Sequence, residues 1–275
     1  MYNFPLLYLL ISVFLLECQA MEDFNFNIEG KVCIITGAGR GLGREISMRF
    51  AQSGCRTAIL SRTSTELESL AAEMEKIGSE ALAFKADVTD SGEVRKVVDS
   101  VVNEYGTVDI LVNNAAVNIR KPLIEYSDEE WHSILSTNLT GYFYFAREVG
   151  KIMIARRSGK VVNVGSELGV VGDTGGQVPY ATSKGGVIQF TRCLAAEWAS
   201  YGINVNCVAP ALMNTPLTAD LFKDERGIKA FLKKIPLGRL PLPSEVADIV
   251  LFFCSPLSNP VTGHIFLVDG GYTAV

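Results

Sequence analysis

The sequence predicts one α/β domain built around a parallel β-sheet of about seven strands. From Lys31 onward, short apolar runs rich in β-branched residues alternate with longer stretches of helical periodicity, as in successive βαβ units. Runs such as 108–114 and 160–165 are apolar without strict alternation, which indicates strands covered by helices on both faces. The length of 275 residues suits a single domain of this class, and no internal repeat interrupts the pattern.

Seven runs are expected to form the strands, and helices are expected between them. The runs cover residues 31–35, 55–61, 81–86, 108–114, 160–165, 203–209 and 264–269. The stretch 64–78 carries helix boundary signals, because Thr65 precedes Glu68 by three residues and Gly78 follows the helical pattern. These residues predict a capping box at the start and a glycine stop at the end.

Composition and charge limit the kinds of molecule that the protein is expected to bind. The net charge of −5, without a run of five or six like charges, argues against a nucleic-acid footprint and favours a small-molecule partner. The six cysteines show no CxxC spacing and the two histidines lie far apart, so neither a metal site nor a disulfide framework is indicated. We therefore expect reduced thiols and a cytoplasmic protein.

Residues 1–20 form a hydrophobic extension in front of the domain proper, which covers residues 21–275. Residues 5–16 are apolar except for Tyr8 and Ser12. This run is shorter than the roughly 20 residues of a spanning helix, and no Lys or Arg precedes it as in a signal peptide. Three interpretations stay open: a dispensable upstream extension, a packed helix, or a targeting or membrane segment with contact through residues 4–16.

The segment TGAGRGLG, residues 36–43, follows the first strand and opens the first helix. In this setting glycines let backbone N–H groups approach a pyrophosphate, because a Cβ would hold the phosphates off. The segment predicts a Rossmann-type, doubly wound sheet. Its spacing, with glycines at 37, 41 and 43, differs from GxGxxG, and the alternative is an ordinary tight turn.

Two arginines predict NADP(H) in preference to NAD(H). The second strand ends in Ser61 and Arg62, where an NAD site would have an acidic residue, and Arg40 sits inside the glycine-rich segment. Guanidinium groups bind a 2′-phosphate bidentately, whereas a carboxylate would repel it. The alternative is that both arginines are solvated surface charges.

Tyr180 and Lys184 are four residues apart at the start of a predicted helix, so they lie on one face. An adjacent ammonium favours the phenolate, and we expect it to lower the tyrosine pKa from about 10 and make Tyr180 a general acid and base. Ser166 ends a strand at the carboxyl edge of the sheet, where its hydroxyl could hold a carbonyl oxygen. A turn or helix cap is the alternative role for Ser166.

Together these motifs resemble the short-chain dehydrogenase/reductase family over residues 27–275. In chain order they are TGAGRGLG, Asp87-Val88, NNAA at 113–116, Asn138 within STNLTG, Gly165-Ser166, YATSK at 180–184, NCVAP at 206–210 and VDGG at 268–271. The resemblance implies an enzyme that interconverts a ketone and a secondary alcohol by hydride transfer. It implies a homotetramer or homodimer as well.

The resemblance assigns roles to four catalytic residues. Tyr180 would transfer the proton, Ser166 would orient the carbonyl, Lys184 would bind the nicotinamide ribose, and Asn138 would hold a relay water. The implied cofactor-binding residues are Gly37, Arg40, Gly41, Leu42, Gly43, Ser61, Arg62, Asp87, Val88, Asn114, Ala115, Tyr180, Lys184, Pro210, Met213 and Thr215. Alanines at 116 and 211 replace usual glycines, which would weaken cofactor binding if either backbone needed positive φ.

Substrate contacts are expected from Asn118, Glu167, Leu168 and Val178, and from residues 212–239, which resemble the mobile lid of the family. Residues 118–131 and 197–206 resemble the branch of gluconate 5-dehydrogenases. Within that branch Arg120 and Lys121 would attract a carboxylate, although exposed loop charges are the alternative. The substrate would be a keto sugar acid.

Three other functions stay open at this point. The same scaffold serves 3-oxoacyl thioester reductases, so a fatty-acid-type reductase is the main alternative. A non-catalytic cofactor-binding scaffold is an alternative of another class. A membrane-tethered reductase of lipid-like ketones is a third.

Overall fold

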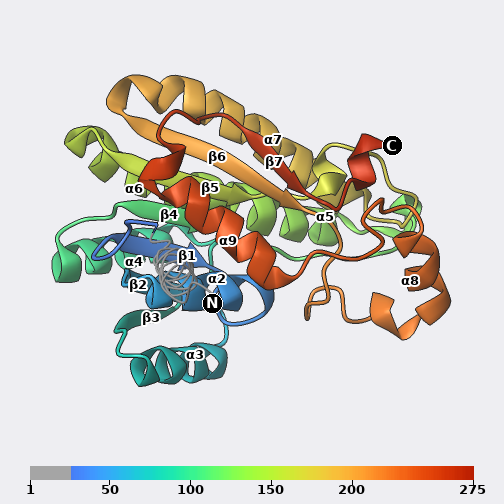
Figure 1. Ribbon diagram of the computed structural model, residues 1–275, viewed down its shortest axis with the longest axis horizontal. Helices are drawn as coiled ribbons and strands as arrows, with labels where there is room; N and C mark the ends of the chain where they lie inside the picture. Colours follow the sequence, from blue (N-terminus) through green and yellow to red (C-terminus); the bar gives the residue numbers. More distant parts are fainter. Residues whose placement is uncertain (1–25) are drawn as a thin grey trace, which may run out of the picture.

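The seven predicted strands form one sheet in the computed structural model, which describes residues 26–275 (Figure 1). Every strand pair is parallel, and the strand order is β3-β2-β1-β4-β5-β6-β7. The strands are β1 (Val32–Thr36), β2 (Arg56–Ser61), β3 (Ala81–Lys85), β4 (Ile110–Asn113), β5 (Gly159–Val164), β6 (Ile203–Pro210) and β7 (Ile265–Val268). The predicted Rossmann-type sheet is confirmed.

Helices cover both faces of the sheet. Two separate apolar clusters fill the spaces between them, with side chains of α2, α3 and α9 on one face and of α4, α6 and α7 on the other. The long helices are α2 (Gly41–Gln52), α3 (Ser64–Lys76), α4 (Ser91–Tyr105), α5 (Asp128–Leu135), α6 (Gly141–Arg156), α7 (Val178–Trp198), α8 (Glu225–Leu232) and α9 (Pro243–Cys254). Burial of both faces explains why the strand runs are continuously apolar.

The N-terminal predictions fall outside the described residues. These are the hydrophobic extension at residues 1–20 and the membrane contact through residues 4–16. From residue 26 to residue 275, no helix has the length and apolar character that crossing a membrane requires.

Helix α3 corrects one boundary prediction and supports another. The helix begins at Ser64 with Thr63 at the N-cap, and Thr63 makes no side-chain capping bond. The capping box predicted at Thr65 and Glu68 is therefore wrong, because Thr65 already lies inside the first turn. Gly78 has φ +76° directly after the C-cap residue, so the predicted glycine stop is confirmed.

The loops after β1 and β4 are bound to each other at the point where the strand order reverses. Thr36 Oγ1 accepts hydrogen bonds from the backbone N–H groups of Asn114 (2.8 Å) and Ala115 (3.0 Å). In return, Asn114 Nδ2 donates to the carbonyl oxygens of Thr36 (2.9 Å) and Gly37 (3.1 Å). Ligands of open α/β sheets bind in this crevice, so these four bonds fix its two walls.

A buried chain of amides and a hydroxyl attaches α7 to the sheet. Asn113 Nδ2 on β4 donates to Asn163 Oδ1 on β5 at 3.0 Å, and Asn163 Nδ2 donates to Thr191 Oγ1 on α7 at 3.0 Å. Thr191 Oγ1 in turn donates to the carbonyl oxygen of Val187. Because all three polar side chains are buried, this chain holds α7 in one position against β4 and β5.

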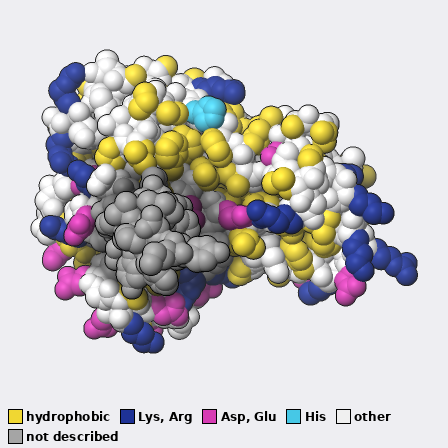
Figure 2. All heavy atoms as spheres, viewed as in Figure 1, with side chains coloured by type: hydrophobic (Ala, Val, Ile, Leu, Met, Phe, Trp, Pro, Cys, Tyr) yellow, Lys and Arg dark blue, Asp and Glu magenta, His cyan; other side chains and the backbone are white. Residues whose placement is uncertain are grey.

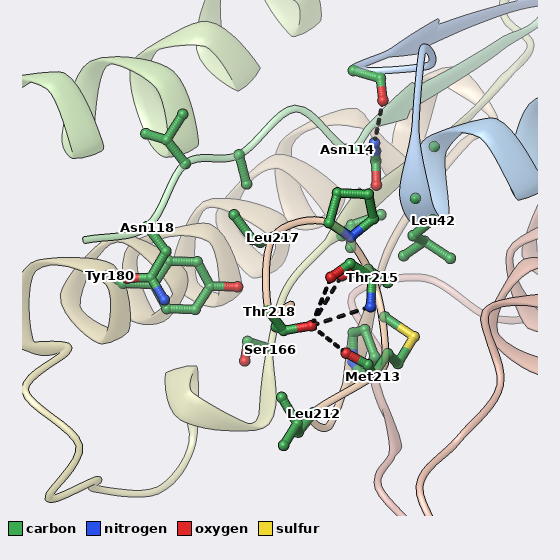
Figure 3. Close-up of a pocket in the computed structure, with 18 of the residues that line it drawn as sticks. Leu42, Asn114, Asn118, Ser166, Tyr180, Leu212, Met213, Thr215, Leu217 and Thr218 are labelled. Carbon is green, nitrogen blue, oxygen red and sulfur yellow. Dashed lines mark hydrogen bonds between the residues drawn. The ribbon is translucent and has the colours of Figure 1, made fainter. Parts of the chain in front are cut away.

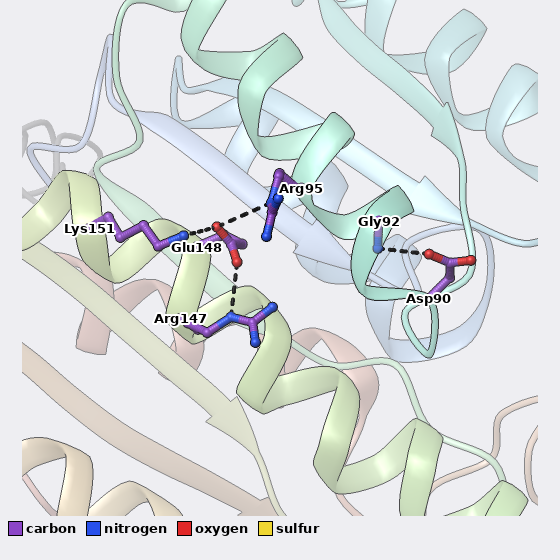
Figure 4. A network of polar contacts seen from close by, with 6 residues as sticks. All are labelled: Asp90, Gly92, Arg95, Arg147, Glu148 and Lys151. Atoms are coloured by element: carbon purple, nitrogen blue, oxygen red, sulfur yellow. Dashed lines mark hydrogen bonds and ion pairs between the residues drawn. The ribbon is translucent and has the colours of Figure 1, made fainter.

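An ion-pair network joins α4 to α6 on the outer surface (Figure 4). The Glu148 carboxylate is buried and lies 2.9 Å from Arg147 Nε and 4.0 Å from Arg95 Nε of α4, and it also pairs with Lys151. Burial alone would raise the pKa of Glu148, but Lys151 and Arg147 outweigh it and lower the pKa. On the face drawn in Figure 2, Lys and Arg side chains are interspersed with Asp and Glu.

We predict that Thr36→Val destabilises the protein by about 1–3 kcal/mol, because valine keeps the shape but leaves two backbone N–H groups without an acceptor. The control is Thr57→Val on the neighbouring strand, whose Oγ1 lies 4.0 Å from Met74 Sδ and is also buried. Chemical denaturation measures both variants. Equal losses for the two would mean that the bonds of Thr36 do not stabilise the crevice.

Candidate active site

A cavity of about 560 Å³ lies at the carboxyl ends of the central strands, between the glycine-rich loop and the segment that leads into α8 (Figure 3). Most of the predicted site residues contribute to its wall. They are Gly37, Arg40, Gly41, Leu42, Gly43, Ser61, Arg62, Asp87, Val88, Asn114, Ala115, Asn118, Ser166, Glu167, Leu168, Tyr180, Lys184, Pro210, Met213 and Thr215. Asn138 and Val178 do not belong to the wall.

The glycine-rich loop leaves room and hydrogen-bond donors for a phosphate group. A Cβ on Gly37 would lie 2.8 Å from Ala115 Cα, and one on Gly43 would lie 2.1 Å from the Gly37 carbonyl oxygen, so only glycine fits these positions. Helix α2 starts in the wall of the cavity. Its N-cap residue, Arg40, forms no side-chain capping bond, and the first turn of the helix has no acidic residue. Its free N–H groups and helix dipole therefore suit an anion.

Arg40, one of the two predicted arginines, lies near the carboxylate of Glu66. Arg40 Nη1 is 3.7 Å from Glu66 Oε1, and Arg40 is the more exposed partner. Ser61, Arg62 and Glu66 line the cavity together with Arg40. A 2′-phosphate could use both guanidinium groups there, and it would compete with Glu66 for Arg40.

The alanines at 116 and 211 cause no backbone strain. Both line the cavity. In the described chain the non-glycine residues with positive φ are Asn27 and Arg157, so neither alanine adopts that conformation. Ala211 is also fixed by its N–H, which donates to the Val268 carbonyl oxygen at 3.0 Å.

Tyr180 and Ser166 both point into the cavity in Figure 3. Ser166 Oγ accepts a hydrogen bond from the Leu168 N–H at 3.2 Å, so this serine caps the short helix at Glu167–Gly169 and also faces the cavity. Burial raises the pKa of Tyr180 to about 12, with a further rise from Glu167, and the Ser166 hydroxyl and Arg120 lower it only in part.

Lys184 is buried beneath the tyrosine. Its Nζ donates to the Val164 carbonyl oxygen at 2.7 Å and to Tyr142 Oη at 3.4 Å, and it lies 5.7 Å from the centre of the Tyr180 ring. Burial lowers the pKa of Lys184 to about 8. The prediction that this ammonium lowers the pKa of Tyr180 is wrong for this structure, because desolvation of both groups dominates.

Asn138 lies behind the wall, in a π-helical turn between α5 and α6 at Ser136–Thr140. Its Oδ1 accepts from the Val117 N–H at 2.8 Å, and its Nδ2 donates to the Val117 carbonyl oxygen and to Ser183 Oγ. The side chain is fully buried. It therefore fixes the backbone of a wall residue and reaches α7 next to Lys184.

Glu167 brings a buried carboxyl group to the cavity. It is only 5% exposed, and its Oε2 has no hydrogen-bond partner. Burial raises the pKa of Glu167 to about 8, and Asp269 and Asp173 raise it further, while the N–H groups of Glu167 and Leu212 lower it. The group is therefore mostly protonated at neutral pH.

The predicted basic pair divides between the cavity and the surface. Arg120 lines the cavity, and its Nε donates to Gln177 Oε1 at 3.2 Å. Lys121 instead pairs with Glu130 and lies 5.2 Å from the centre of the Tyr126 ring, outside the wall. The prediction that Lys121 faces a substrate is therefore wrong.

Several residues of the cavity wall were not predicted from the sequence. Each lies next to a motif that was predicted, so the position beside that motif could have indicated it. Tyr272 follows VDGG at the end of β7, at the same sheet edge as the other loops. Gln177 immediately precedes α7, and Glu66 lies in the first turn of α3 after Arg62. Val178 was predicted there and is instead 42% exposed at the start of α7.

Residues 212–239, predicted as a lid, contribute their first half and α8 to the wall. Thr218 Oγ1 bonds back to the N–H of Thr215 at 3.2 Å, as Figure 3 shows, and this closes the turn after β6. In the described part of the chain, no cluster of three or more His, Cys, Asp or Glu residues could hold a metal ion.

Comparisons with known proteins agree on one family. A family model described as enoyl-(acyl carrier protein) reductase matches residues 37–273. The 3-oxoacyl-(acyl-carrier-protein) reductase of Thermotoga maritima is 40% identical over 244 residues, which are 89% of this chain and 98% of that protein.

Two further relatives act on other substrates. The D-threitol dehydrogenase of Mycolicibacterium smegmatis is 36% identical over 258 residues, 93% of this chain and 98% of that protein. The crystal structure of a gluconate 5-dehydrogenase from Burkholderia cenocepacia in complex with NADP and tartrate has a TM-score of 0.87 and 33% identity, with coverage of 91% and 98%.

We predict that Glu167→Gln makes the free energy of unfolding less dependent on pH. The ordinary pKa of this carboxyl is 4.5 and its folded pKa is about 8, so between these values the folded protein binds more protons than the unfolded chain. The stabilising contribution of the protonated form is therefore lost as pH rises from 4.5 to 8 in the wild type, by on the order of a few kcal/mol.

Chemical denaturation at pH 5 and pH 8 measures this difference, and the variant should gain most at pH 8. Glu75→Gln, which removes an exposed carboxylate on α3 away from the cavity wall, is the control. A wild-type curve parallel to that of Glu167→Gln would contradict the raised pKa.

Proposed function

Because the chain belongs to the short-chain dehydrogenase/reductase family of oxidoreductases, we propose that it interconverts a ketone and a secondary alcohol with NADP(H). The observation that carries the proposal is the position of the Tyr180 hydroxyl. It lies beside Ser166 and above Lys184, in a cavity that continues to the glycine-rich loop at the start of α2.

NADP(H) is the expected cofactor. The free N–H groups at the start of α2 suit its pyrophosphate, and Arg40 and Arg62 suit its 2′-phosphate. The similarity to a gluconate 5-dehydrogenase that binds NADP supports this choice. The cofactor supplies or accepts the hydride, and the protein supplies orientation and proton transfer.

Tyr180 is the proton donor in carbonyl reduction. With a pKa of about 12 its phenol is neutral at pH 7, so it can give a proton to the oxygen of the substrate while Ser166 orients that oxygen. In the alcohol-oxidising direction it would have to act as phenolate, whose fraction grows about tenfold per pH unit below the pKa. The raised pKa of Tyr180 therefore favours reduction at neutral pH and oxidation at alkaline pH.

Lys184 and Asn138 support this proton transfer. Lys184 is fixed by the Val164 carbonyl oxygen and lies under the Tyr180 ring, where it can bind ribose hydroxyls of the cofactor. Asn138 acts as a positioning residue, through Val117 and Ser183. Both N–H donors of Asn138 Nδ2 already have protein acceptors, so neither is left to hold a water. The relay water at Asn138 stays a prediction.

The proposed substrate is a keto sugar acid. Arg120 lines the cavity and can pair with a carboxylate, and Asn118 and Gln177 add polar groups to the same wall. A 3-oxoacyl thioester is the alternative, which the 40% identity to the Thermotoga maritima reductase favours. The convergence of Ser166, Tyr180 and Lys184 argues against a non-catalytic scaffold.

We predict that Tyr180→Phe lowers kcat for carbonyl reduction by about 10²–10⁴-fold, the range that positioned acid catalysis contributes. NADPH binding should change little, because only the hydroxyl is removed from the ring. Steady-state rates and NADPH fluorescence measure the two effects, with Tyr201→Phe, just after the C-terminal end of α7 and outside the cavity wall, as the control. Survival of turnover in Tyr180→Phe would show that another group donates the proton.

We also predict that the full-length protein oxidises NADPH faster than NADH and reduces 5-ketogluconate faster than an acetoacetyl thioester. Initial rates with each of the four cofactor and substrate pairs test both points, because the arginine argument concerns only the cofactor and the Arg120 argument only the substrate. Faster reduction of the thioester would move the protein to the fatty-acid type and leave Arg120 without a role in substrate binding.

A further inference from the structure

Two buried oxygens in the wall of the active-site cavity have no hydrogen-bond partner. In residues 26–275, four buried side-chain polar atoms lack a partner, and two of them, Glu167 Oε2 and Asn118 Oδ1, belong to residues that line this cavity. Buried polar groups in proteins are almost always hydrogen-bonded, because an unpaired one keeps the full penalty of losing water. Each of the two atoms is covered by protein in a residue that lines the cavity, so a ligand group that reaches it would remove that penalty.

Other contacts hold each oxygen in place. Asn118 Nδ2 donates to Gln177 Oε1 at 2.6 Å, which fixes the orientation of the amide and leaves its oxygen without a donor. The Glu167 carboxyl interacts with the N–H groups of Glu167 and Leu212, and its second oxygen is the unpaired one. The two residues come from different loops, after β4 and after β5.

Both side chains are close to the proposed proton donor. Asn118 is hydrogen-bonded to Gln177, which precedes Tyr180 by three residues at the start of α7, and the carboxyl of Glu167 is near enough to raise the pKa of the Tyr180 phenol. Ser166 precedes Glu167 directly in the chain. The unpaired oxygens therefore lie next to the place where the reacting carbonyl group would be oriented.

We propose that Glu167 and Asn118 select substrates that carry hydroxyl groups beside the reacting carbon. This inference rests on the proposed ketone reduction. A neighbouring hydroxyl of a hydroxyketone donates to Asn118 Oδ1, and another pairs with Glu167 Oε2. The carboxyl accepts from that hydroxyl when ionised and donates to it when protonated, so the site tolerates either state.

The same groups discriminate against an acyl chain. The methylene groups of a 3-oxoacyl thioester cannot donate, so binding it would leave both oxygens buried and unpaired. Sites built around hydrogen bonds to substrate hydroxyls reject analogues that lack them much more strongly than apolar pockets reject a size change. Arg120 lies on the same wall and can bind a carboxylate at the far end of a hydroxylated substrate.

The test compares two ketones with the same four-carbon skeleton, erythrulose with three hydroxyls and 2-butanone with none. For the full-length wild type we expect kcat/KM with NADPH to be at least about 100-fold higher for erythrulose. Glu167→Met and Asn118→Leu should each lower this ratio about tenfold or more. Glu167→Gln, which keeps an acceptor oxygen, should retain the ratio within about threefold.

Controls separate folding and surface effects from recognition. Glu75→Met, the same substitution at an exposed position on α3, should keep the wild-type ratio. NADPH binding, followed by fluorescence, checks that each variant is folded, and the wild-type ratio tests the inference without any variant.

The outcomes distinguish this inference from the proposed function. Turnover of both ketones at similar kcat/KM by the wild type, or an unchanged ratio in both Glu167→Met and Asn118→Leu, would overturn the selection of hydroxyls and leave the reductase activity standing. Absence of NADPH oxidation with these ketones, 5-ketogluconate and the thioester alike would overturn the proposed function and, with it, this inference.

Discussion

The hydrogen bonds between Thr36 and the Asn114 loop are the constraint on which the rest of the site depends. The neighbouring strands β1 and β4 end at this point, and the chain continues from them to helices on opposite faces of the sheet, so their loops would separate if nothing joined them. The Thr36 hydroxyl and the Asn114 amide close the gap, and the close approach that results permits only glycine at position 37. The start of α2 thereby faces the cavity, where its backbone N–H groups suit an anion.

Near Tyr180 the cavity contains ionisable groups whose burial costs free energy. Lys184, Glu167 and the Tyr180 hydroxyl are all desolvated. Burial lowers the pKa of the lysine and raises the pKa of the other two groups, so each neutral form is favoured. The buried chain from Asn113 through Asn163 to Thr191 holds α7 rigidly enough to keep Lys184 and Tyr180 in place. Strongly perturbed groups that share one cavity are typical of catalytic sites.

Asn118 and Glu167 connect this electrostatic picture to specificity. Their unpaired oxygens belong to residues of the same wall as the proposed proton donor, so the groups that shift the pKa of Tyr180 would also contact the substrate. A comparable arrangement exists near the glycine-rich loop, where Arg40 pairs with Glu66. In both places affinity and selectivity depend on polar partners that the ligand must supply or displace.

The order of apolar runs and glycines determined the fold by itself, because strand burial, helix periodicity and the first βα loop are local properties of the chain. It also located Ser166, Tyr180 and Lys184, whose spacing follows from one helix and one strand end. Tertiary structure alone decided the rest, since the pKa of Tyr180, the turn of Lys121 toward Glu130 and the burial of Asn138 behind Val117 depend on contacts between distant segments. The Thr65 prediction failed for a smaller reason, because a one-residue shift in where α3 begins moves the capping position.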